Sequence, residues 1–331
     1  MKALIQKLVE AFGPSGYESA VRELIQSEIK GLGDEQAVDA LGNLIVRKGS
    51  KSADGMRIML SAHMDEIGLI VTHVDEQGFA RVTNIGGVFT TNVIGSRVRF
   101  INGASGVLFN DGYPAEKPAA LDKCYLDLGA TSPADCPVKI GDVAGFERPM
   151  LDLGKRLVAK SMDDRIACVI LIEALRQLKD TPHEVYFVFS TQEEVGTRGA
   201  TTAAYGIDPD LAIAIDVTKT GDTPKAAKMD VALGKGPAIK VKDSGMISDP
   251  RVVRWMANTA EAAAIPYQYE VLDGGSTDAR AMQLARAGVP AGCISVACRY
   301  VHSPSEMVDY DDVQQSVALL VKLLSAPVEL K

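Results

Sequence analysis

The amino-acid sequence predicts an α/β fold in which a mostly parallel central sheet is flanked by helices and carries an inserted small β-rich domain. Apolar, strand-like runs alternate with helical patterns through the second half of the chain. Between residues 68 and 157, short strand-like pieces separated by Gly and Asn turns replace that alternation. The length of 331 residues, with 47% hydrophobic and 24% charged residues, suits one large or two ordinary globular domains.

The first part of the chain predicts two helices followed by two strands. The stretch MKALIQKLVEAFG (1–13) has the pattern of a short amphipathic helix. Ser15 and Glu18 then have the spacing of a capping box, which predicts the start of a second helix. Strands are expected over NLIVRKG (43–49) and RIMLSAHMDEIGLIV (57–71), and the second is apolar enough to be buried on both faces.

The middle of the chain predicts the inserted domain. Segments such as GLIVTHVDEQGFARVTNIGG (68–87) and SRVRFINGASGVLFN (96–110) read as short strands joined by turns, and no long helical pattern appears among them. We therefore expect an α/β domain formed by residues 1–67 together with 158–331. The β-rich domain is expected over residues 68–157.

After the insertion, helices and strands alternate again. In chain order, we expect a helix over 163–180, strands over 184–190 and 210–217, a helix over 250–264, a strand over 266–272, a helix over 279–288, a strand over 291–297 and a final helix over 311–325. Strands connected by helices of this length favour parallel pairing, because a parallel connection needs a crossover of a dozen or more residues.

Composition and charge exclude several classes of function. The net charge of −8 argues against binding to nucleic acid or to an anionic membrane surface. No apolar run reaches the roughly 18 residues of a membrane span. The five cysteines include no C-x-x-C motif, which disfavours a zinc ribbon or a disulfide framework and favours a reducing, cytoplasmic location.

Residues that can bind metal ions follow the predicted strands, at the edge where open α/β sheets bind ligands. They are His63 and Asp65, Asp163 and Asp164, Glu193 and Glu194, Asp216 and His302. His63 and Asp65 are two residues apart in an extended segment and therefore point to the same side. The chain has only four histidines, and the other two, His73 and His183, have no such setting.

Each of these residues also has a structural explanation when it is considered alone. Asp163 or Asp164 could cap the following helix, a histidine could be a hydrogen-bonded structural residue, and a glutamate pair is usually solvated. Burying several carboxylates together, however, costs many kcal/mol unless cations supply the missing charge. Imidazole and carboxylate ligands without thiolates suit Zn²⁺, Co²⁺ or Mn²⁺, and this set is large enough for a two-metal site.

Several motifs together resemble those of the M42 family of di-metal aminopeptidases, which includes the glutamyl and tetrahedral aminopeptidases. They are GPSGYE, SAHMDEIGLIV, KSMDDR, STQEEVGTRGA, AIDVT, GGSTDA and RYVHSPSEMV, and they occur in the family's order along nearly the whole chain. Each motif is weak alone, whereas the ordered set is specific. One departure is Ser276, in GGST, where relatives often have a third glycine.

The resemblance implies a zinc-exopeptidase-like fold and a role for most of these residues. It implies two divalent metal ions per subunit, with zinc as the first choice and cobalt or manganese as alternatives. The implied metal ligands are His63, Asp163, Glu194, Asp216 and His302, with Asp163 as the bridging carboxylate. Glu193 would be the general base, and Asp65 would lie behind His63 and fix its tautomer. Asp164 receives no role beyond capping the helix.

The implied function is the hydrolysis of the first residue from peptides with a free amino terminus. Alternatives are a metal-dependent deacylase or amidase acting on N-acyl amino acids, a glucanase, and a binding module without activity. The resemblance also implies a homo-oligomer, from dimer to dodecamer, in which the β-rich domain mediates dimerisation. The preferred first residue of the substrate is open, although Arg299 or Lys219 could favour an acidic side chain.

Overall fold

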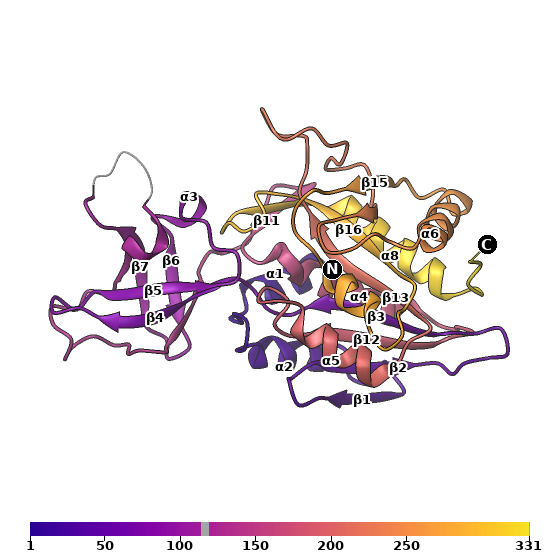
Figure 1. The fold of residues 1–331 in the computed structure, drawn as a ribbon, viewed down its shortest axis with the longest axis horizontal. Coiled ribbons are helices and arrows are strands. Elements are labelled where there is room, and N and C mark those ends of the chain that lie inside the picture. The colour runs from indigo at the N-terminus through magenta and orange to yellow at the C-terminus, as the bar shows by residue number, and fades with distance from the viewer. Residues whose placement is uncertain (114–118, 331) are drawn as a thin grey trace.

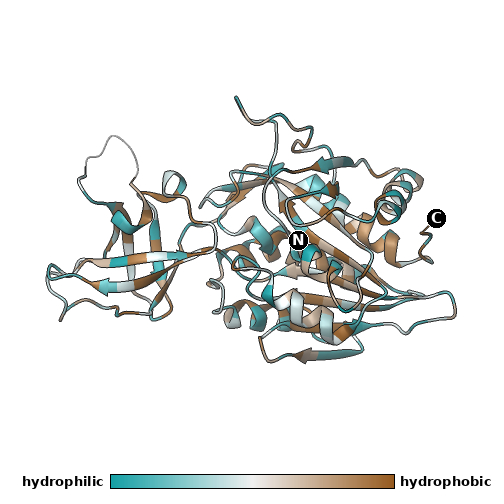
Figure 2. Ribbon diagram, viewed as in Figure 1, coloured by the Kyte–Doolittle hydropathy of each residue, from teal (hydrophilic) through white to brown (hydrophobic). Residues whose placement is uncertain are grey.

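The computed structural model of the chain describes residues 1–113 and 119–330. A large sheet covered by helices forms the main body, and a small barrel extends from one end of it (Figure 1). Hydrophobic residues are concentrated in the strands at the centre of the main body (Figure 2). The chain therefore has a mixed α/β fold with a separate small β-sheet.

The large sheet has a parallel centre and antiparallel edges. Its strand order is β1 (Glu35–Val38), β2 (Leu44–Lys48), β12 (Glu184–Ser190), β3 (Arg57–His63), β13 (Leu211–Thr218), β16 (Ala291–Arg299), β17 (Glu306–Asp309), β11 (Arg156–Ala159) and β10 (Leu151–Asp152). Strands β12, β3, β13 and β16 pair in parallel, as the alternation of helices and strands predicts. The edges are antiparallel because short turns join β1 to β2 and β16 to β17.

A short two-stranded extension lies beside β16. Strand β14 (Ala238–Lys242) pairs with β16 in the antiparallel sense and with β15 (Gln268–Val271) in the parallel sense. Helix α6 (Pro250–Ala262) connects β14 to β15, which is the crossover that this parallel pair requires.

Helices cover both faces of the large sheet. One hydrophobic cluster contains α1 (Lys2–Glu10), α2 (Ser19–Glu28), α4 (Met162–Gln177), α6 and α8 (Tyr310–Leu324), and a second contains α5 (Arg198–Ile207) and α7 (Asp278–Gln283). Leu60 of β3 belongs to the first cluster and its neighbour Met59 to the second. Alternate side chains of this strand thus enter opposite cores, which explains its continuous apolar sequence. Among the described residues, every helix is too short or too polar to cross a bilayer.

The small barrel is closed and antiparallel. Its strands, in spatial order, are β4 (Gly68–Val74), β5 (Ala80–Ile85), β8 (Cys124–Asp127), β7 (Ser105–Asn110), β6 (Arg97–Phe100) and β9 (Val143–Phe146), with α3 (Thr90–Val93) and a 3₁₀ turn at Leu121–Lys123. Leu69, Leu108 and Leu126 are fully buried in its own hydrophobic core. These strands lie within the stretch 68–157 that the sequence assigns to the inserted domain. Strand β10 and the start of β11 also lie in that stretch, but they belong to the large sheet.

The strand expected over 57–71 is two strands in different sheets. β3 ends at His63, and β4 begins at Gly68 in the barrel. Between them, the Glu66 carboxylate is buried and accepts a hydrogen bond of 2.6 Å from Lys160. The apolar pattern could not reveal this break, because both strands are equally apolar.

The capping box expected at Ser15 and Glu18 does not form. Helix α2 begins at Ser19 without a side-chain cap. The Ser15 hydroxyl instead donates to Asp65 at 2.6 Å, and the Glu18 carboxylate accepts from the backbone N–H of Gln192 at 3.1 Å. Both polar residues therefore support the loops at the carboxyl end of the sheet, a tertiary role that local spacing does not show.

Candidate metal centre

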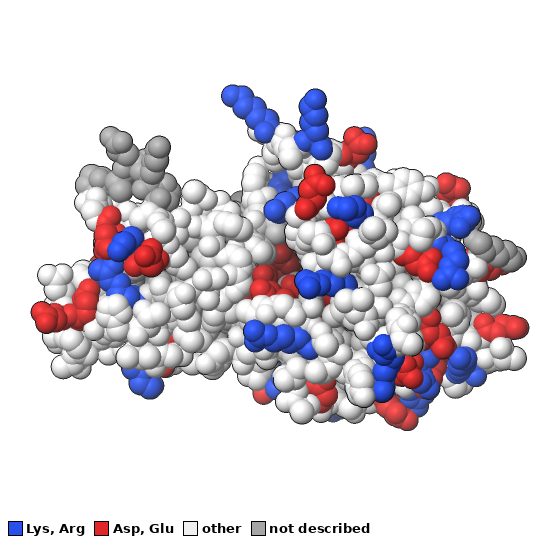
Figure 3. Space-filling view, in the orientation of Figure 1, with Lys and Arg blue, Asp and Glu red and all other residues white. Residues whose placement is uncertain are grey.

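The candidate site is a cavity of about 670 Å³ at the carboxyl ends of the parallel strands. Each side chain enters it from a definite element: His63 from the end of β3, Asp163 from the start of α4, Glu193 and Glu194 from the loop after β12, Asp216 from β13 and His302 from the loop after β16. Acidic side chains are visible in a hollow beside the barrel, with lysine and arginine side chains near it (Figure 3). The parallel centre of the sheet thus gathers residues that are far apart in sequence.

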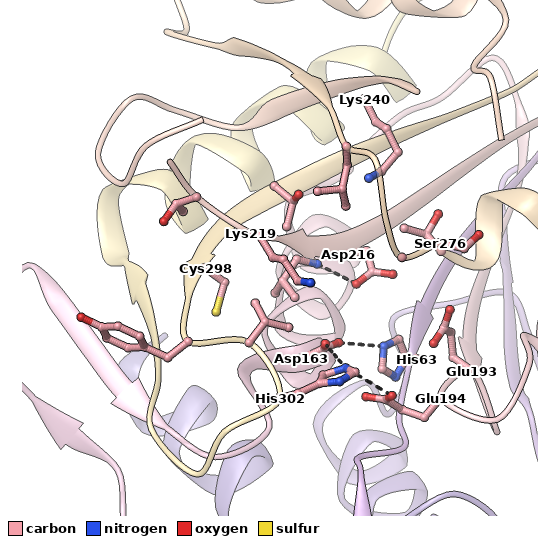
Figure 4. Close-up of a pocket in the computed structure, with 18 of the residues that line it drawn as sticks. His63, Asp163, Glu193, Glu194, Asp216, Lys219, Lys240, Ser276, Cys298 and His302 are labelled. Atoms are coloured by element: carbon pink, nitrogen blue, oxygen red, sulfur yellow. Dashed lines mark hydrogen bonds and ion pairs between the residues drawn. The ribbon is translucent and has the colours of Figure 1, made fainter. Parts of the chain in front are cut away.

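Asp163 lies between the two imidazoles of the site (Figure 4). Its Oδ1 is 3.0 Å from Nε2 of His63, and its Oδ2 is 3.3 Å from Nε2 of His302. His302 Nε2 is also 3.4 Å from Oε2 of Glu194. The Asp163 carboxylate therefore presents one oxygen to His63 and the other to His302.

Two sets of ligand atoms lie close enough together to hold metal ions. His63, Asp163 and Glu194 form one set and His63, Asp164 and Asp216 form the other, with the ligand atoms of each set within 4.8 Å of one another. Asp216 therefore lies near His63, on the opposite side of the centre from Glu194 and His302 (Figure 4).

Asp164 is part of the centre and does not cap the helix, contrary to the sequence-based expectation. The residue at the N-terminal cap of α4 is Ser161. Asp164 is fully buried, its Oδ2 accepts from the backbone N–H of His63 at 3.3 Å, and its Oδ1 has no hydrogen-bond partner among the described residues. An unpaired buried carboxylate oxygen is costly, and a nearby cation would reduce that cost.

Asp65 holds several parts of the centre in position. Its two carboxylate oxygens accept from the backbone N–H groups of Glu193 at 2.9 Å and Glu194 at 3.1 Å. Its backbone oxygen is 3.1 Å from Nδ1 of His63, and its Oδ1 is 3.4 Å from the same nitrogen. These contacts fix the glutamate pair and orient the imidazole at the same time.

Glu306 is a further buried acidic residue at the centre, which motif spacing did not single out. Its carboxylate accepts from the backbone N–H of Asp163 at 2.9 Å and from that of His302 at 2.7 Å. The only signal in the sequence is its place four residues after His302, within RYVHSPSEMV. Sequence alone could not show that this side chain turns back to hold the backbone of two site residues.

Buried carboxylates outnumber the imidazoles at the centre. Burial acts to raise the pKa of Asp163, but the imidazoles outweigh it and hold the pKa below its usual range. Burial acts to lower the pKa of His302, yet the carboxylates of Asp163 and Glu194 raise the pKa to about 11. Burial raises the pKa of both Glu193 and Asp216 well above the usual range. This excess of buried carboxylates, together with the imidazoles, fits divalent cations such as Zn²⁺.

Other polar groups line the remaining wall of the cavity. Arg299 is paired with Asp222 through contacts of 2.9 and 2.8 Å, so its charge is already balanced. Lys219 is exposed and makes no ion pair with any residue in the described part of the chain. The Oγ of Ser276, at the position that departs from the family motif, is buried and lacks a hydrogen-bond partner among the described residues.

Comparison with known proteins agrees with this geometry. The family model described as M42 glutamyl aminopeptidase matches residues 42–319. The lysyl aminopeptidase of Pyrococcus furiosus is 36% identical over 338 residues, which cover 97% of this chain and 96% of that protein. These matches include both the large sheet and the barrel.

Solved structures show the same architecture. An aminopeptidase of the archaeon Desulfurococcus kamchatkensis superposes with a TM-score of 0.94 and 39% identity, covering 98% of this chain and 94% of the other. The TET1 peptidase of Pyrococcus horikoshii, which can assemble into a tetrahedron or a large octahedral shell, superposes with a TM-score of 0.87 and 32% identity over 98% and 99% of the chains. The resemblance seen in the motifs is confirmed: the chain belongs to the M42 peptidase family and is a metal-dependent aminopeptidase, a hydrolase of peptide bonds.

Proposed function

We propose that two divalent ions bind in the cavity and share Asp163 between them. His63 and Asp216 would complete one site, and Glu194 and His302 the other. The position of Asp163 between both imidazoles supports this division. Zinc is the first candidate, and cobalt and manganese are the alternatives, because all three accept nitrogen and carboxylate oxygen ligands. Bound there, the ions would neutralise the carboxylates, lower the pKa of a coordinated water and polarise the carbonyl of the scissile bond.

Glu193 is the proposed proton carrier of the reaction. Its carboxylate lines the cavity and makes no hydrogen bond to any described residue, so both oxygens are available to water or substrate. It accepts a proton from the attacking water and returns that proton to the amine of the departing peptide. Asp65 holds the backbone of Glu193 in place and thereby fixes the direction from which the proton is transferred.

The observation that carries this function is the arrangement of the cavity. Two imidazoles and a larger number of buried carboxylates lie together there, next to the Glu193 carboxylate, which has no hydrogen-bond partner among the described residues. Replacing Glu193 with Gln should lower kcat by at least about 100-fold while the metal content stays unchanged. The measurement is hydrolysis of aminoacyl-p-nitroanilides, with metal analysis of the same preparation. Glu184→Gln, at the opposite end of β12, is the matched control and should remain fully active. Normal turnover of the Glu193 variant with its metals in place would remove Glu193 from this role.

The same assay separates peptide hydrolysis at a free amino terminus from deacylation. A peptide with a free amine should be cleaved, and its N-acetylated form should not. Preferential cleavage of the acetylated form would favour the deacylase alternative. Relatives are named as glutamyl and lysyl aminopeptidases, so the first residue that this protein prefers has to be measured with the same assay.

The protein is also proposed to form a homo-oligomer, from dimer to dodecamer, through the barrel. Exposed hydrophobic side chains on the barrel support this, among them Phe89, Ile101 and Ile140. The tetrahedral and octahedral assemblies of the similar TET1 peptidase support it as well. Light scattering at assay concentration tests it, and a monomer would contradict it.

A cytoplasmic location is proposed from the five free cysteines, which suit a reducing compartment.

A further inference from the structure

A second cavity, of about 560 Å³, adjoins the catalytic cavity and shares Asn92 and Tyr300 with it. It lies between the barrel and the main body: β6 contributes Arg97, the segment after β9 contributes Arg148, and the loop after β16 contributes Ser303 and other residues. That loop also carries His302 into the catalytic cavity. One loop therefore separates the two cavities and lines both.

The second cavity carries an excess of positive charge. Arg97 is exposed and forms no ion pair with any described residue, and Arg148 donates to the Ser305 hydroxyl without an acidic partner. The one acidic residue among its described lining residues is Glu147, which lies 4.0 Å from Arg99. Two guanidinium groups are thus available to a ligand. The planar donor fork of a guanidinium matches a carboxylate and binds it through two hydrogen bonds.

The position of this cavity suits the part of a peptide that leaves the reaction centre. An aminopeptidase cleaves after the first residue, so every later residue of the substrate lies on one side of the scissile bond. The shared rim offers a surface for that part: Tyr300 is half exposed, and the ring of Phe89 stacks on His302 with centroids 6.2 Å apart. A peptide of three to five residues spans roughly 10–17 Å when extended, which is the scale of two adjoining cavities of this size.

We propose that the second cavity binds the terminal carboxylate of a short peptide through Arg97 and Arg148 while the amino end of the peptide lies at the metal centre. This inference rests on the proposed function. It makes the enzyme selective for short oligopeptides, because only in these can both ends reach their sites together. It also assigns the specificity to groups on the barrel side of the cavity, remote from the reacting atoms.

The test compares three substrates that share the first residue best accepted in a p-nitroanilide assay. They are a tetrapeptide with a free carboxyl terminus, the same tetrapeptide as its amide, and the aminoacyl-p-nitroanilide, which has no terminal carboxylate. The native enzyme should cleave the free acid with a kcat/KM about tenfold above that of the amide. The difference should lie mainly in KM, because the contact is remote from the reacting bond.

The double variant Arg97→Gln with Arg148→Gln should remove the difference between acid and amide while p-nitroanilide hydrolysis stays unchanged. Both side chains are exposed, so the fold should tolerate the change. Arg81→Gln, also on the barrel and paired with Asp111 at 2.8 Å, is the matched control and should behave like the native enzyme. Light scattering should show that the variants keep the native assembly.

Three outcomes would overturn the inference. Equal cleavage of acid and amide by the native enzyme would do so, and so would a preference for the acid that survives in the double variant. If an amidated tetrapeptide ending in Asp were cleaved as fast as the free acid, the site would recognise any carboxylate, and its assignment to the chain terminus would be wrong. Failure of the proposed function is distinguishable, because it would abolish hydrolysis of all substrates, including the p-nitroanilide.

Discussion

Single residues at the centre divide into those that face the cavity and those that hold the others in place. Asp65 and Glu306 belong to the second group, because their carboxylate oxygens are occupied by backbone N–H groups of site residues. Each connects segments that are distant in sequence: Asp65 binds Ser15 as well as the glutamate pair, and Glu306 binds Asp163 as well as the nearby His302. A carboxylate can do this because its two oxygens accept several hydrogen bonds at once. Such residues tune a metal centre without reaching the substrate.

Replacing Glu306 with Gln should weaken metal binding by about 10- to 100-fold, as is typical when a group supporting a ligand is lost. The amide keeps one acceptor oxygen, so one of the backbone N–H groups of Asp163 and His302 loses its partner. Metal affinity measured by competition with a chelator checks this, with circular dichroism to verify the fold. Glu173→Gln, in a surface ion pair of α4, is the control. Unchanged affinity in the Glu306 variant would show that the two backbone contacts do not position the ligands.

We expect the charge of Lys219 to favour substrates with an acidic first side chain. It lines the catalytic cavity, whereas the buried Lys240 in the same wall is already paired with Glu270. Lys219→Gln should lower kcat/KM for Glu-p-nitroanilide up to about fivefold relative to Leu-p-nitroanilide, and less at high salt, because the amine is exposed. Lys51→Gln is the control, because Lys51 lies in the loop between β2 and β3, away from the cavity, and pairs with Asp210. An equal loss for both substrates would exclude a role in selectivity.

At the end of the sheet opposite the active site, His183 connects the segment before β3 with the segment after α8. His183, just before β12, accepts from the backbone N–H of Met56 at 3.0 Å and lies 2.9 Å from the backbone oxygen of Ala326, beyond α8. The first contact requires an unprotonated Nδ1. Burial lowers the pKa of His183, and the contact with Ala326 only partly opposes this. The folded protein therefore holds this histidine in its neutral form.

The contribution of His183 to stability should consequently fall as the pH drops below the pKa of an unfolded histidine, about 6.5. In that range the imidazole binds a proton in the unfolded chain that it excludes in the folded chain, so its contribution to the free energy of unfolding decreases with decreasing pH. His183→Gln should be less stable at pH 8 but should lose less further stability between pH 7 and pH 5. Urea unfolding of both proteins at several pH values measures the difference in slope. Identical slopes would mean that His183 does not titrate on unfolding.

At the scale of the whole molecule, periodic sequence patterns predict the regular strands and helices. They do not show features that depend on contacts between residues distant in sequence. The apolar runs of β12, β13 and β16 and the helices between them predicted the parallel centre of the sheet. The same reasoning merged β3 with β4, because apolarity does not show when a chain passes into another core. Ser15 matched a local capping pattern, yet it hydrogen-bonds Asp65, fifty positions further along.

The residues of the candidate site also divide into those that the sequence predicts and those that only the folded structure shows. Residues such as His63, Asp216 and His302 were predicted because they follow strands whose ends must converge in a parallel sheet. The sequence gives Asp164 only a capping role, because nothing in it shows that this side chain is buried against the backbone of His63. The arginines of the second cavity, Arg97 and Arg148, lie on segments that meet the catalytic loop only in three dimensions.

The proposed division into two domains has a physical basis in the separate hydrophobic cores. The barrel strands pair only with one another among the described residues, and the barrel core shares no buried residue with the cores of the main body. Two cores joined by a few chain segments can open independently, because unfolding one exposes little of the other. Hydrogen exchange should therefore report two cooperative units.

Leu126→Ala tests this independence, because Leu126 is fully buried in the barrel core. The substitution should destabilise the barrel by about 2–5 kcal/mol, the usual cost of such a cavity. Exchange should accelerate in β4 to β9 and stay slow in β12, β3 and β13, because those strands pack in a different core. Leu60→Ala, in the main core, should produce the reverse pattern. If either substitution accelerated exchange equally in both sheets, barrel and main body would unfold as one unit, and the barrel would not constitute a separate domain.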